Sequence, residues 1–177
     1  MPLMQNNQQN IYLIGMPSSG KSTLGRAMAV ALGYEYVDMD EIIVQNEHRS
    51  IFQIFQESGE GYFRKIESDL LKSFTKNQKK IISTGGGVPC FFDNMDFILE
   101  NGISVYLDVS PQNLFERIDN SSKNDRPLID KTDRNKLLEN LIEKYNYRYR
   151  FYSKANIIIK EDYTVGHIIN KLKELIG

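Results

Sequence analysis

Short apolar runs alternate along the chain with longer segments in which apolar residues recur at helical spacing. Five runs have the length of buried strands, and they lie at 11–14, 36–37, 79–83, 103–107 and 156–159. Helical spacing predicts helices at about 21–32, 51–55, 61–74, 137–145 and 165–176, and one more that starts at Ser110. Strands separated by helices are typical of a parallel sheet covered on both faces. The pattern therefore predicts a three-layer α/β/α fold with a five-stranded parallel sheet.

Several predicted helix ends carry the residues that ends prefer. Ser50 and Gln53 have the spacing of a capping box, and Ser110 precedes Pro111 as an N-cap serine precedes a first-turn proline. Gly33 stands where a C-terminal glycine cap would end the first helix. No internal repeat or linker divides the chain, so we expect a single domain over residues 1–177.

Composition excludes several classes of protein. The formal net charge of the 177 residues is −1, which gives no broad basic field for nucleic acid. No apolar run reaches the roughly 20 residues that span a bilayer. Cys90 is the single cysteine, so no disulfide forms within the chain, and a reducing compartment fits best. We expect a cytoplasmic protein that binds neither nucleic acid nor membrane.

Residues 15–22, Gly-Met-Pro-Ser-Ser-Gly-Lys-Ser, match the phosphate-binding pattern G-x-x-x-x-G-K-[ST] between a predicted strand and a predicted helix. In such a P-loop, backbone N–H groups and the helix N-terminus surround phosphate oxygens. Lys21 is expected to reach the β- and γ-phosphates, and the Ser22 hydroxyl to coordinate Mg²⁺. The candidate nucleotide-binding residues of this segment are Gly15, Ser18, Ser19, Gly20, Lys21, Ser22 and Thr23.

Other features narrow the class of P-loop protein. GTPases usually carry an Asn-Lys-x-Asp run for guanine, and the sequence Asn-Lys-Leu-Leu at 135–138 lacks the acid. Motor and AAA-type ATPases keep an apolar strand that ends in Asp-Glu. Here the third strand ends in Thr84 and three glycines instead. These departures favour a kinase.

Further short motifs follow the P-loop in order along the chain. They are Asp38-Met39-Asp40, Phe63-Arg64 with Glu67, Gly85-Gly86-Gly87, Arg126-Pro127-Leu128, and Arg148 with Tyr152 and Ala155. With these motifs the chain resembles the shikimate kinases, in the nucleoside-monophosphate-kinase-like branch of P-loop proteins. The resemblance extends from residue 11 to the last predicted helix.

This resemblance implies a reaction and a division of the chain. The reaction is transfer of the γ-phosphate of Mg-ATP to shikimate, giving shikimate 3-phosphate in chorismate and aromatic amino acid biosynthesis. A substrate-binding helical insert is expected at about 40–74 and a lid at about 119–131. A monomer is expected. Two alternatives stay open: another small-metabolite kinase, similar to gluconate kinase, and a nucleotide-binding module without catalysis.

On the acceptor side, the resemblance places Arg64 and Arg148 on the shikimate carboxylate, which planar guanidinium groups bind with both oxygens. Gly85, Gly86 and Gly87 would leave the backbone open to the acceptor at a strand end. Asp40 would accept a hydrogen bond from the reacting hydroxyl and take its proton. Glu67, one helical turn after Arg64, would orient that guanidinium. Asp40 could instead be a helix N-cap, and the arginines could be surface residues.

On the nucleotide side, Asp38 would face the metal through a water. Arg117 resembles the family's adenine-facing arginine, and Arg126 would meet the γ-phosphate in the transition state. The expected catalytic residues are thus Lys21, Asp40 and Arg126. The chain departs from the family's pattern at Ser18, where glycine is most frequent. Arg150 lies close enough to Arg148 to leave the late arginine ambiguous, although the spacing to Tyr152 and Ala155 favours Arg148.

Overall fold

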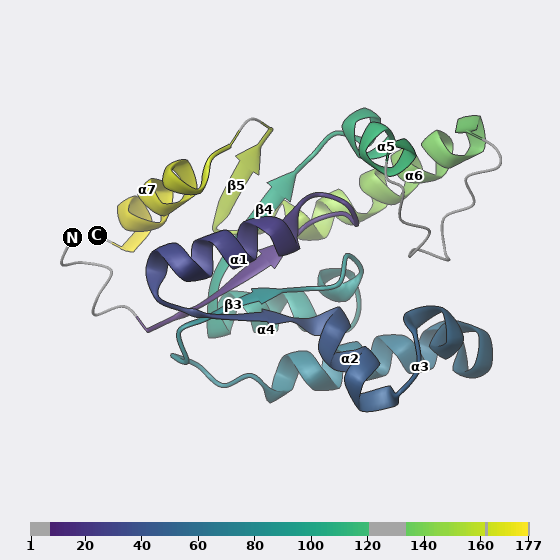
Figure 1. Cartoon of the computed structure of the whole chain (residues 1–177), viewed down its shortest axis with the longest axis horizontal. Helices are drawn as coiled ribbons and strands as arrows, with labels where there is room; N and C mark the ends of the chain where they lie inside the picture. Colours follow the sequence, from purple (N-terminus) through teal and green to yellow (C-terminus); the bar gives the residue numbers. More distant parts are fainter. Residues whose placement is uncertain (1–7, 121–133, 162, 177) are drawn as a thin grey trace.

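The computed structural model describes residues 8–120, 134–161 and 163–176 of the chain (Figure 1). Within these ranges five strands form one sheet in the order β2-β3-β1-β4-β5, and all neighbouring strands are parallel. The strands are β1 (Asn10–Ile14), β2 (Glu35–Asp38), β3 (Lys80–Ser83), β4 (Gly102–Asp108) and β5 (Ile157–Lys160). The predicted five-stranded parallel sheet is therefore confirmed.

The helices of the described part follow the strands in an alternating order. They are α1 (Lys21–Leu32), α2 (Met39–Glu47), α3 (Ile51–Ser73), α4 (Asn94–Asn101), α5 (Pro111–Asp119), α6 (Arg134–Tyr152) and α7 (Val165–Ile176), with a short 3₁₀ helix, η1, at Val88–Cys90. Three predicted helix ends are confirmed. Ser50 and Gln53 form both bonds of a capping box, the Ser110 side chain caps α5, and Gly33 ends α1 in the left-handed conformation.

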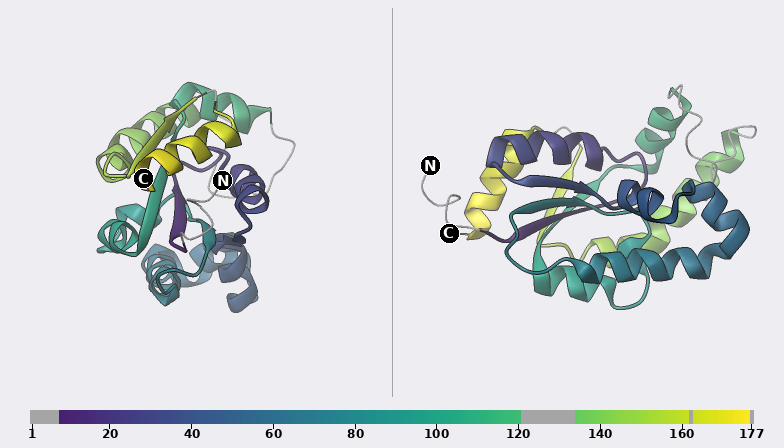
Figure 2. Two further views of the ribbon diagram at one scale, coloured as in Figure 1. Left: turned by 90° about the vertical axis from the view of Figure 1, so that its left-hand side faces the viewer. Right: turned by 60° about the horizontal axis from the view of Figure 1, so that its bottom comes forward.

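Two core clusters lie on opposite faces of the sheet, because successive residues of a strand point to opposite sides. Ile11 and Leu13 of β1 pack with residues of α1 and α7. Tyr12 and Ile14 face the other way, where they pack with residues of α3, α4, α5 and α6. The right-hand view of Figure 2 shows α1 and α7 on one side of the sheet and α4 and α6 on the other. The three-layer α/β/α arrangement is confirmed.

The structure differs from the sequence-based expectations in several places. Helix α4 was not predicted; its eight residues start at Asn94, and the side chain of the N-cap residue Asp93 makes no capping hydrogen bond. The last strand begins at Ile157 rather than at 156, because the Asn156 side chain accepts hydrogen bonds from the N–H and hydroxyl of Ser104. By contrast, the helices expected at 51–55 and 61–74 are both present, as the two parts of α3 on either side of a bend at Gly59 (φ 79°, ψ 169°).

The carboxyl ends of the three neighbouring strands β2, β3 and β1 lie on one side of the sheet, since the strands are parallel. After β1 the chain enters the P-loop, β2 ends at Asp38, and β3 leads into the three glycines at 85–87. Ligands bind at this edge in open α/β sheets. No helix among the described residues is both long and apolar enough to cross a membrane.

Candidate active site

The loop between β1 and α1, residues 15–20, folds tightly at the start of α1. Gly15 and Gly20 have φ angles of 144° and 98°, which glycine adopts at the lowest cost. A Cβ on Gly15 would lie 2.8 Å from the carbonyl oxygen of Leu107. The Ser19 N–H donates to the carbonyl oxygen of Met16 at 3.1 Å. The loop is thus held close to the end of β4 and can keep its N–H groups directed to one centre.

Lys21 is buried at the base of this loop. Its Nζ donates to the carbonyl oxygens of Gly15 and Met16, both at 2.9 Å. The buried Ser19 hydroxyl, in contrast, has no hydrogen-bond partner within the described structure. A buried polar group without a partner is costly, so this hydroxyl is suited to a ligand oxygen. An ammonium group and an unpaired hydroxyl in one loop match the needs of a bound phosphate chain.

Two residues from distant segments hold the P-loop backbone from outside. Arg117, from α5, donates through Nη1 to the carbonyl oxygens of Ser19 at 3.1 Å and Ser18 at 3.4 Å. The Tyr163 hydroxyl donates to the same Ser19 oxygen at 3.0 Å. Arg117 was predicted at the nucleotide from the sequence, whereas Tyr163 was not, because no motif marks a tyrosine before the last helix. Together they place a cation and an aromatic ring beside the loop.

Ser22 and Asp38 come together beside the P-loop. The Ser22 hydroxyl donates to Asp38 Oδ2 at 2.9 Å, and the Tyr36 hydroxyl donates to the same oxygen at 2.9 Å. Burial and the nearby Asp38 carboxylate raise the pKa of Tyr36 to about 12, so it remains a donor at neutral pH. Asp38 Oδ1 accepts from the backbone N–H of Asp40 at 3.1 Å, which makes Asp38 the N-cap of α2. The alternative in which Asp40 is the cap is therefore wrong.

The donor atoms at Ser22 and Asp38 fit a magnesium ion. Mg²⁺ prefers oxygen ligands and is usually held by one or two protein groups, with water and phosphate oxygens completing the shell. No cluster of three or more metal-ligating side chains occurs in the described ranges, so a cage built from protein ligands alone is absent there. A hydroxyl and a carboxylate next to a phosphate-binding loop suit a nucleotide-bound Mg²⁺.

The three glycines after β3 lie among charged side chains. A Cβ on Gly85 would be 2.5 Å from Glu67 Oε1 and 3.0 Å from Asp40 Oδ1, and a Cβ on Gly87 would be 2.5 Å from Arg64 Nη1. The backbone therefore approaches these groups more closely than any other residue would allow. This loop gathers Asp40, Arg64 and Glu67, which come from two different helices.

Arg64 is buried and held from two sides. Its Nη1 donates to Glu67 Oε2 at 2.6 Å, while Nε and Nη2 donate to Glu60 Oε1 at 3.1 and 2.9 Å. The predicted pairing of Glu67 with Arg64 is confirmed, and the description of Arg64 as a surface arginine is wrong. The guanidinium carbon lies 4.5 Å from the centre of the Phe91 ring, with the rings of Phe63 at 5.3 Å and Phe55 at 5.7 Å. This aromatic wall excludes water and strengthens any ion pair that Arg64 makes.

Glu67 is a weak acid in this setting. Burial raises the pKa of Glu67 to about 7, and the negative charge of Asp40 acts in the same direction. Arg64 and Arg148 lower the pKa of Glu67 but do not cancel the effect of burial. The site therefore contains a carboxyl group that gains or loses a proton near neutral pH.

Arg148 and Arg150 point to different surroundings. Arg148 is half-buried, and its Nη1 lies 3.9 Å from Met16 Sδ in the P-loop. Arg150 is exposed, and its guanidinium carbon lies 4.4 Å from the centre of the Tyr147 ring and 5.0 Å from that of Phe151. Of these two arginines, Arg148 is the one whose head group lies at the P-loop.

A direct contact joins the two halves of the site. A Cβ on Gly86 would be 2.7 Å from Pro17 Cδ, so the glycine loop packs against the P-loop. The carbonyl oxygen of Gly86 accepts a hydrogen bond from the hydroxyl of Tyr152 in α6. In the sequence, Tyr152 is marked only as part of the motif that contains Arg148 and Ala155. The phosphate-binding and glycine loops are thus held in contact at one place.

The remaining candidates have simpler outcomes. Arg126 lies outside the described residues, as does most of the lid expected at 119–131. Cys90 is buried, and burial raises the pKa of its thiol to about 11, which does not suit a nucleophile. Thr23 is exposed near the start of α1.

Comparisons with known proteins agree with this arrangement. A model of the shikimate kinase family matches residues 17–176 of the chain. A shikimate kinase from Phocaeicola vulgatus is 39% identical over 152 residues, which are 86% of this chain and 86% of that protein. A crystal structure of shikimate kinase from Bacteroides thetaiotaomicron covers 95% of this chain and 98% of its own, with 34% identity and a TM-score of 0.86.

A second solved structure is a shikimate kinase from Acinetobacter baumannii in complex with shikimate. It has 29% identity and a TM-score of 0.83, and the match covers 99% of this chain and 97% of that one. The family model begins within the P-loop and continues to residue 176, and the two solved structures match 95% and 99% of this chain. This chain belongs to the shikimate kinase family.

Proposed function

We propose that this chain transfers the γ-phosphate of ATP to shikimate, producing ADP and shikimate 3-phosphate. The observation that carries the proposal is the contact of two loops, in which the glycine loop beside Arg64 packs against Pro17 of the P-loop. A phosphate donor and an anionic acceptor can therefore meet at one edge of the sheet. The family relationship favours shikimate as this acceptor.

The P-loop half of the site is proposed to bind the phosphate chain of ATP and to neutralise its negative charge. Lys21 would bind the phosphate chain together with the loop N–H groups and the Ser19 hydroxyl. Ser22 would bind Mg²⁺ directly and Asp38 through a water, and the ion would neutralise charge on the transferring phosphoryl group. Arg117 and Tyr163 would support the loop and face the base of the nucleotide.

The acceptor half of the site is proposed to bind shikimate and to hold its reacting hydroxyl in position. Arg64 and Arg148 would bind the carboxylate, and Gly85, Gly86 and Gly87 would let the ring approach the backbone. Asp40 would accept the hydrogen bond of the reacting hydroxyl. Because phosphoryl transfer depends mainly on position and charge, the proton transfer to Asp40 would contribute a modest part of the rate.

An assay of ADP release with purified protein tests the function directly. We expect ADP release to require both Mg²⁺ and shikimate, and gluconate to give no increase. Release with gluconate but not with shikimate would favour the gluconate kinase alternative. Nucleotide binding without release in either case would favour a binding module.

The variant Arg64→Lys tests the acceptor half. Loss of a planar, charge-assisted pair is expected to cost about 1.5–3 kcal/mol, which raises the KM for shikimate roughly ten- to a hundredfold. The KM for ATP should change much less. Arg134→Lys is the matched control, because Arg134 makes an exposed ion pair with Asp119 at 2.9 Å.

A cytoplasmic location and a monomeric state are parts of the same proposal. The buried single cysteine fits a reducing compartment. Light scattering at the assay concentration checks the monomer, and fractionation of the source cells checks the location.

A further inference from the structure

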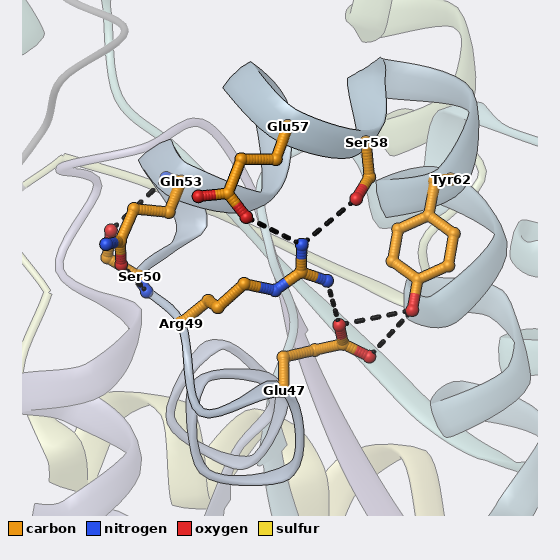
Figure 3. Close-up of polar contacts among 7 residues, drawn as sticks. All are labelled: Glu47, Arg49, Ser50, Gln53, Glu57, Ser58 and Tyr62. Carbon is orange, nitrogen blue, oxygen red and sulfur yellow. Dashed lines mark hydrogen bonds and ion pairs between the residues drawn. The ribbon is translucent and has the colours of Figure 1, made fainter.

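A second arginine, Arg49, lies between α2 and α3 and forms a network of hydrogen bonds with residues of both helices. Its Nη2 donates to Glu47 Oε2 at 2.5 Å, and its Nη1 donates to Glu57 Oε2 and to the hydroxyl of Ser58, both at 3.1 Å. The Tyr62 hydroxyl donates to both oxygens of Glu47, at 2.9 and 3.1 Å. Figure 3 shows these groups around the guanidinium of Arg49. We call these five residues the Arg49 clamp.

The Arg49 clamp spans three pieces of chain. Glu47 is the last residue of α2, and Arg49 lies in the turn that follows it. Glu57 and Ser58 are the last residues of the first part of α3, immediately before the bend at Gly59, and Tyr62 lies just after the bend. A single guanidinium therefore connects the end of α2 to the first part of α3, while Tyr62 connects α2 to the second part.

The first part of α3 reaches the buried Arg64 through an aromatic ring. Phe55 packs on Phe63 with ring centres 4.7 Å apart, and the Phe55 ring lies 5.7 Å from the guanidinium carbon of Arg64. Phe55 lies before the bend at Gly59 and Arg64 lies after it. The angle at the bend thus decides whether Phe55 covers Arg64.

We propose that Arg49 is a positioning residue for the anionic acceptor, because it fixes the bend at Gly59 and so holds Phe55 against Arg64. This inference rests on the proposed function in one respect, the binding of the acceptor carboxylate by Arg64. With Phe55 in place, the guanidinium stays in a pocket with little water, where its pair with a carboxylate is strong. Without it, water reaches Arg64 and the acceptor binds less tightly.

The charged groups of the Arg49 clamp are suited to hold α2 and α3 in one fixed arrangement. Hydrogen bonds from Arg49 and Tyr62 lower the pKa of Glu47, so Glu47 stays ionised at neutral pH. The guanidinium of Arg49 makes bonds in three directions from one rigid plane, which a lysine ammonium on a flexible stem does not reproduce. The glycine at position 59 supplies no side chain of its own to fix the angle. The clamp supplies that restraint from outside.

Steady-state kinetics of Arg49→Met test the inference. We expect the KM for shikimate to rise about fivefold or more, while the KM for ATP stays within about twofold, since the clamp bears on acceptor binding alone. Arg49→Lys should fall between the wild type and Arg49→Met. Lys65→Met is the matched control, because Lys65 makes an exposed pair with Asp69 on the same helix at 2.9 Å and should leave both constants unchanged.

A double-mutant cycle tests whether the effect of Arg49 on acceptor binding passes through Phe55. In a Phe55→Leu background, Arg49→Met should add little to the KM for shikimate, because its effect passes through the ring already removed. Additive effects of the two changes would overturn the inference. So would an unchanged KM for shikimate in Arg49→Met, or equal rises for both substrates.

Hydrogen exchange separates this inference from the function on which it rests. Backbone amides of residues 51–58 should exchange faster in Arg49→Met than in the wild type, and those of α7 should not. If wild-type protein fails to phosphorylate shikimate, the proposed function is wrong whatever the exchange shows. If it does phosphorylate shikimate and exchange at 51–58 is unchanged, the clamp inference is wrong. Should Arg49→Met not fold, Glu57→Gln removes one bond of the clamp and is expected to give the same pattern at a smaller size.

Discussion

The proposed phosphate-binding half and the proposed acceptor-binding half of the site are built in different ways. The phosphate half is nearly continuous in sequence, because the P-loop and the first turn of α1 supply Lys21 and Ser22 within eight residues, 15–22. The acceptor half collects Asp40 from α2, Arg64 and Glu67 from α3, and Arg148 from α6. The first depends on local backbone conformation and the second on packing between helices. Changes in the two halves should therefore have different consequences.

The difference also explains where charge is buried. Lys21 satisfies its ammonium with carbonyl oxygens of its own loop. Arg64 instead satisfies its guanidinium with the carboxylates of Glu60 and Glu67. An incoming carboxylate must fit into an existing set of charges on the acceptor side, whereas phosphate meets a loop rich in donors. Binding of the acceptor should thus depend on pH, whereas binding of phosphate should depend mainly on the charge of Lys21.

The largest effect should follow loss of the lysine. Lys21→Met keeps most of the apolar stem and removes the charge, so we expect kcat to fall by about a thousandfold or more, because the phosphoryl group loses the cation proposed to bind it. Circular dichroism should show a folded protein. Activity within tenfold of the wild type would show that phosphate transfer does not depend on this loop.

The protonation of Glu67 sharpens the contrast with the acceptor side. Its pKa is raised by burial to about 7 from an ordinary value of 4.5, so between these pH values the folded protein holds a proton that the unfolded chain has lost. The contribution of protonated Glu67 to the free energy of unfolding is therefore lost as pH rises from about 4.5 to 7. Above this range the contribution of Glu67 no longer changes with pH.

Glu67→Gln provides the reference for this measurement, because it is neutral at every pH. The difference in unfolding free energy, wild type minus variant, should fall by about 3–4 kcal/mol across this range, at roughly 1.4 kcal/mol per pKa unit. Denaturant unfolding at several pH values measures it. A difference that rises with pH would mean that Arg64 outweighs burial and that Glu67 is ionised throughout.

Substitution of the late arginines tests how the acceptor half is assembled. Arg148→Lys should raise the KM for shikimate about tenfold, because one of two guanidinium forks is lost. Arg150→Lys is the matched variant two residues away, and its exposed side chain should matter little. The reverse order of effects would mean that Arg150 turns into the site when the acceptor binds.

The sequence predicted the continuous parts of the molecule better than the assembled ones. The single strands, the P-loop and the capping box rest on neighbours in the chain, and all of them appear close to where their residues indicate. Glu67 and Arg64 were paired correctly, because one helical turn separates them. Helix α4 has no side-chain cap, and the hydroxyl of Tyr163 reaches the P-loop across 144 positions of sequence, a contact that no local pattern indicates.

The acidic pair shows the same limit at short range. Asp38 and Asp40 are two residues apart, and either could cap a helix by composition. The structure assigns the cap to Asp38, because β2 continues to that residue and leaves the N–H of Asp40 within reach of the Asp38 carboxylate. The choice depends on where the strand ends. That point is set by its pairing with β3, in which Asp38 is opposite Ser83.

The smallest expected effect concerns backbone strain, which occurs in both halves. Ser18 in the P-loop and His48 before the Arg49 clamp have φ angles of 66° and 53°, in the left-handed region that side chains disfavour. Ser18→Gly removes this cost but adds flexibility to the unfolded chain, so we expect a net stabilisation of at most about 1 kcal/mol. His48→Gly should give a similar gain by the same reasoning.

Ser18→Ala is the control that makes the measurement specific, since it keeps the Cβ and removes only the hydroxyl. Denaturant unfolding should rank Ser18→Gly above Ser18→Ala, and the KM for ATP should stay within about twofold for Ser18→Gly, because Arg117 contacts the backbone oxygen at this position. If both variants lose the same stability, the hydroxyl and not the backbone decides the preference at Ser18. The departure from glycine in this P-loop would then be a stabilising feature of the chain and not a tolerated strain.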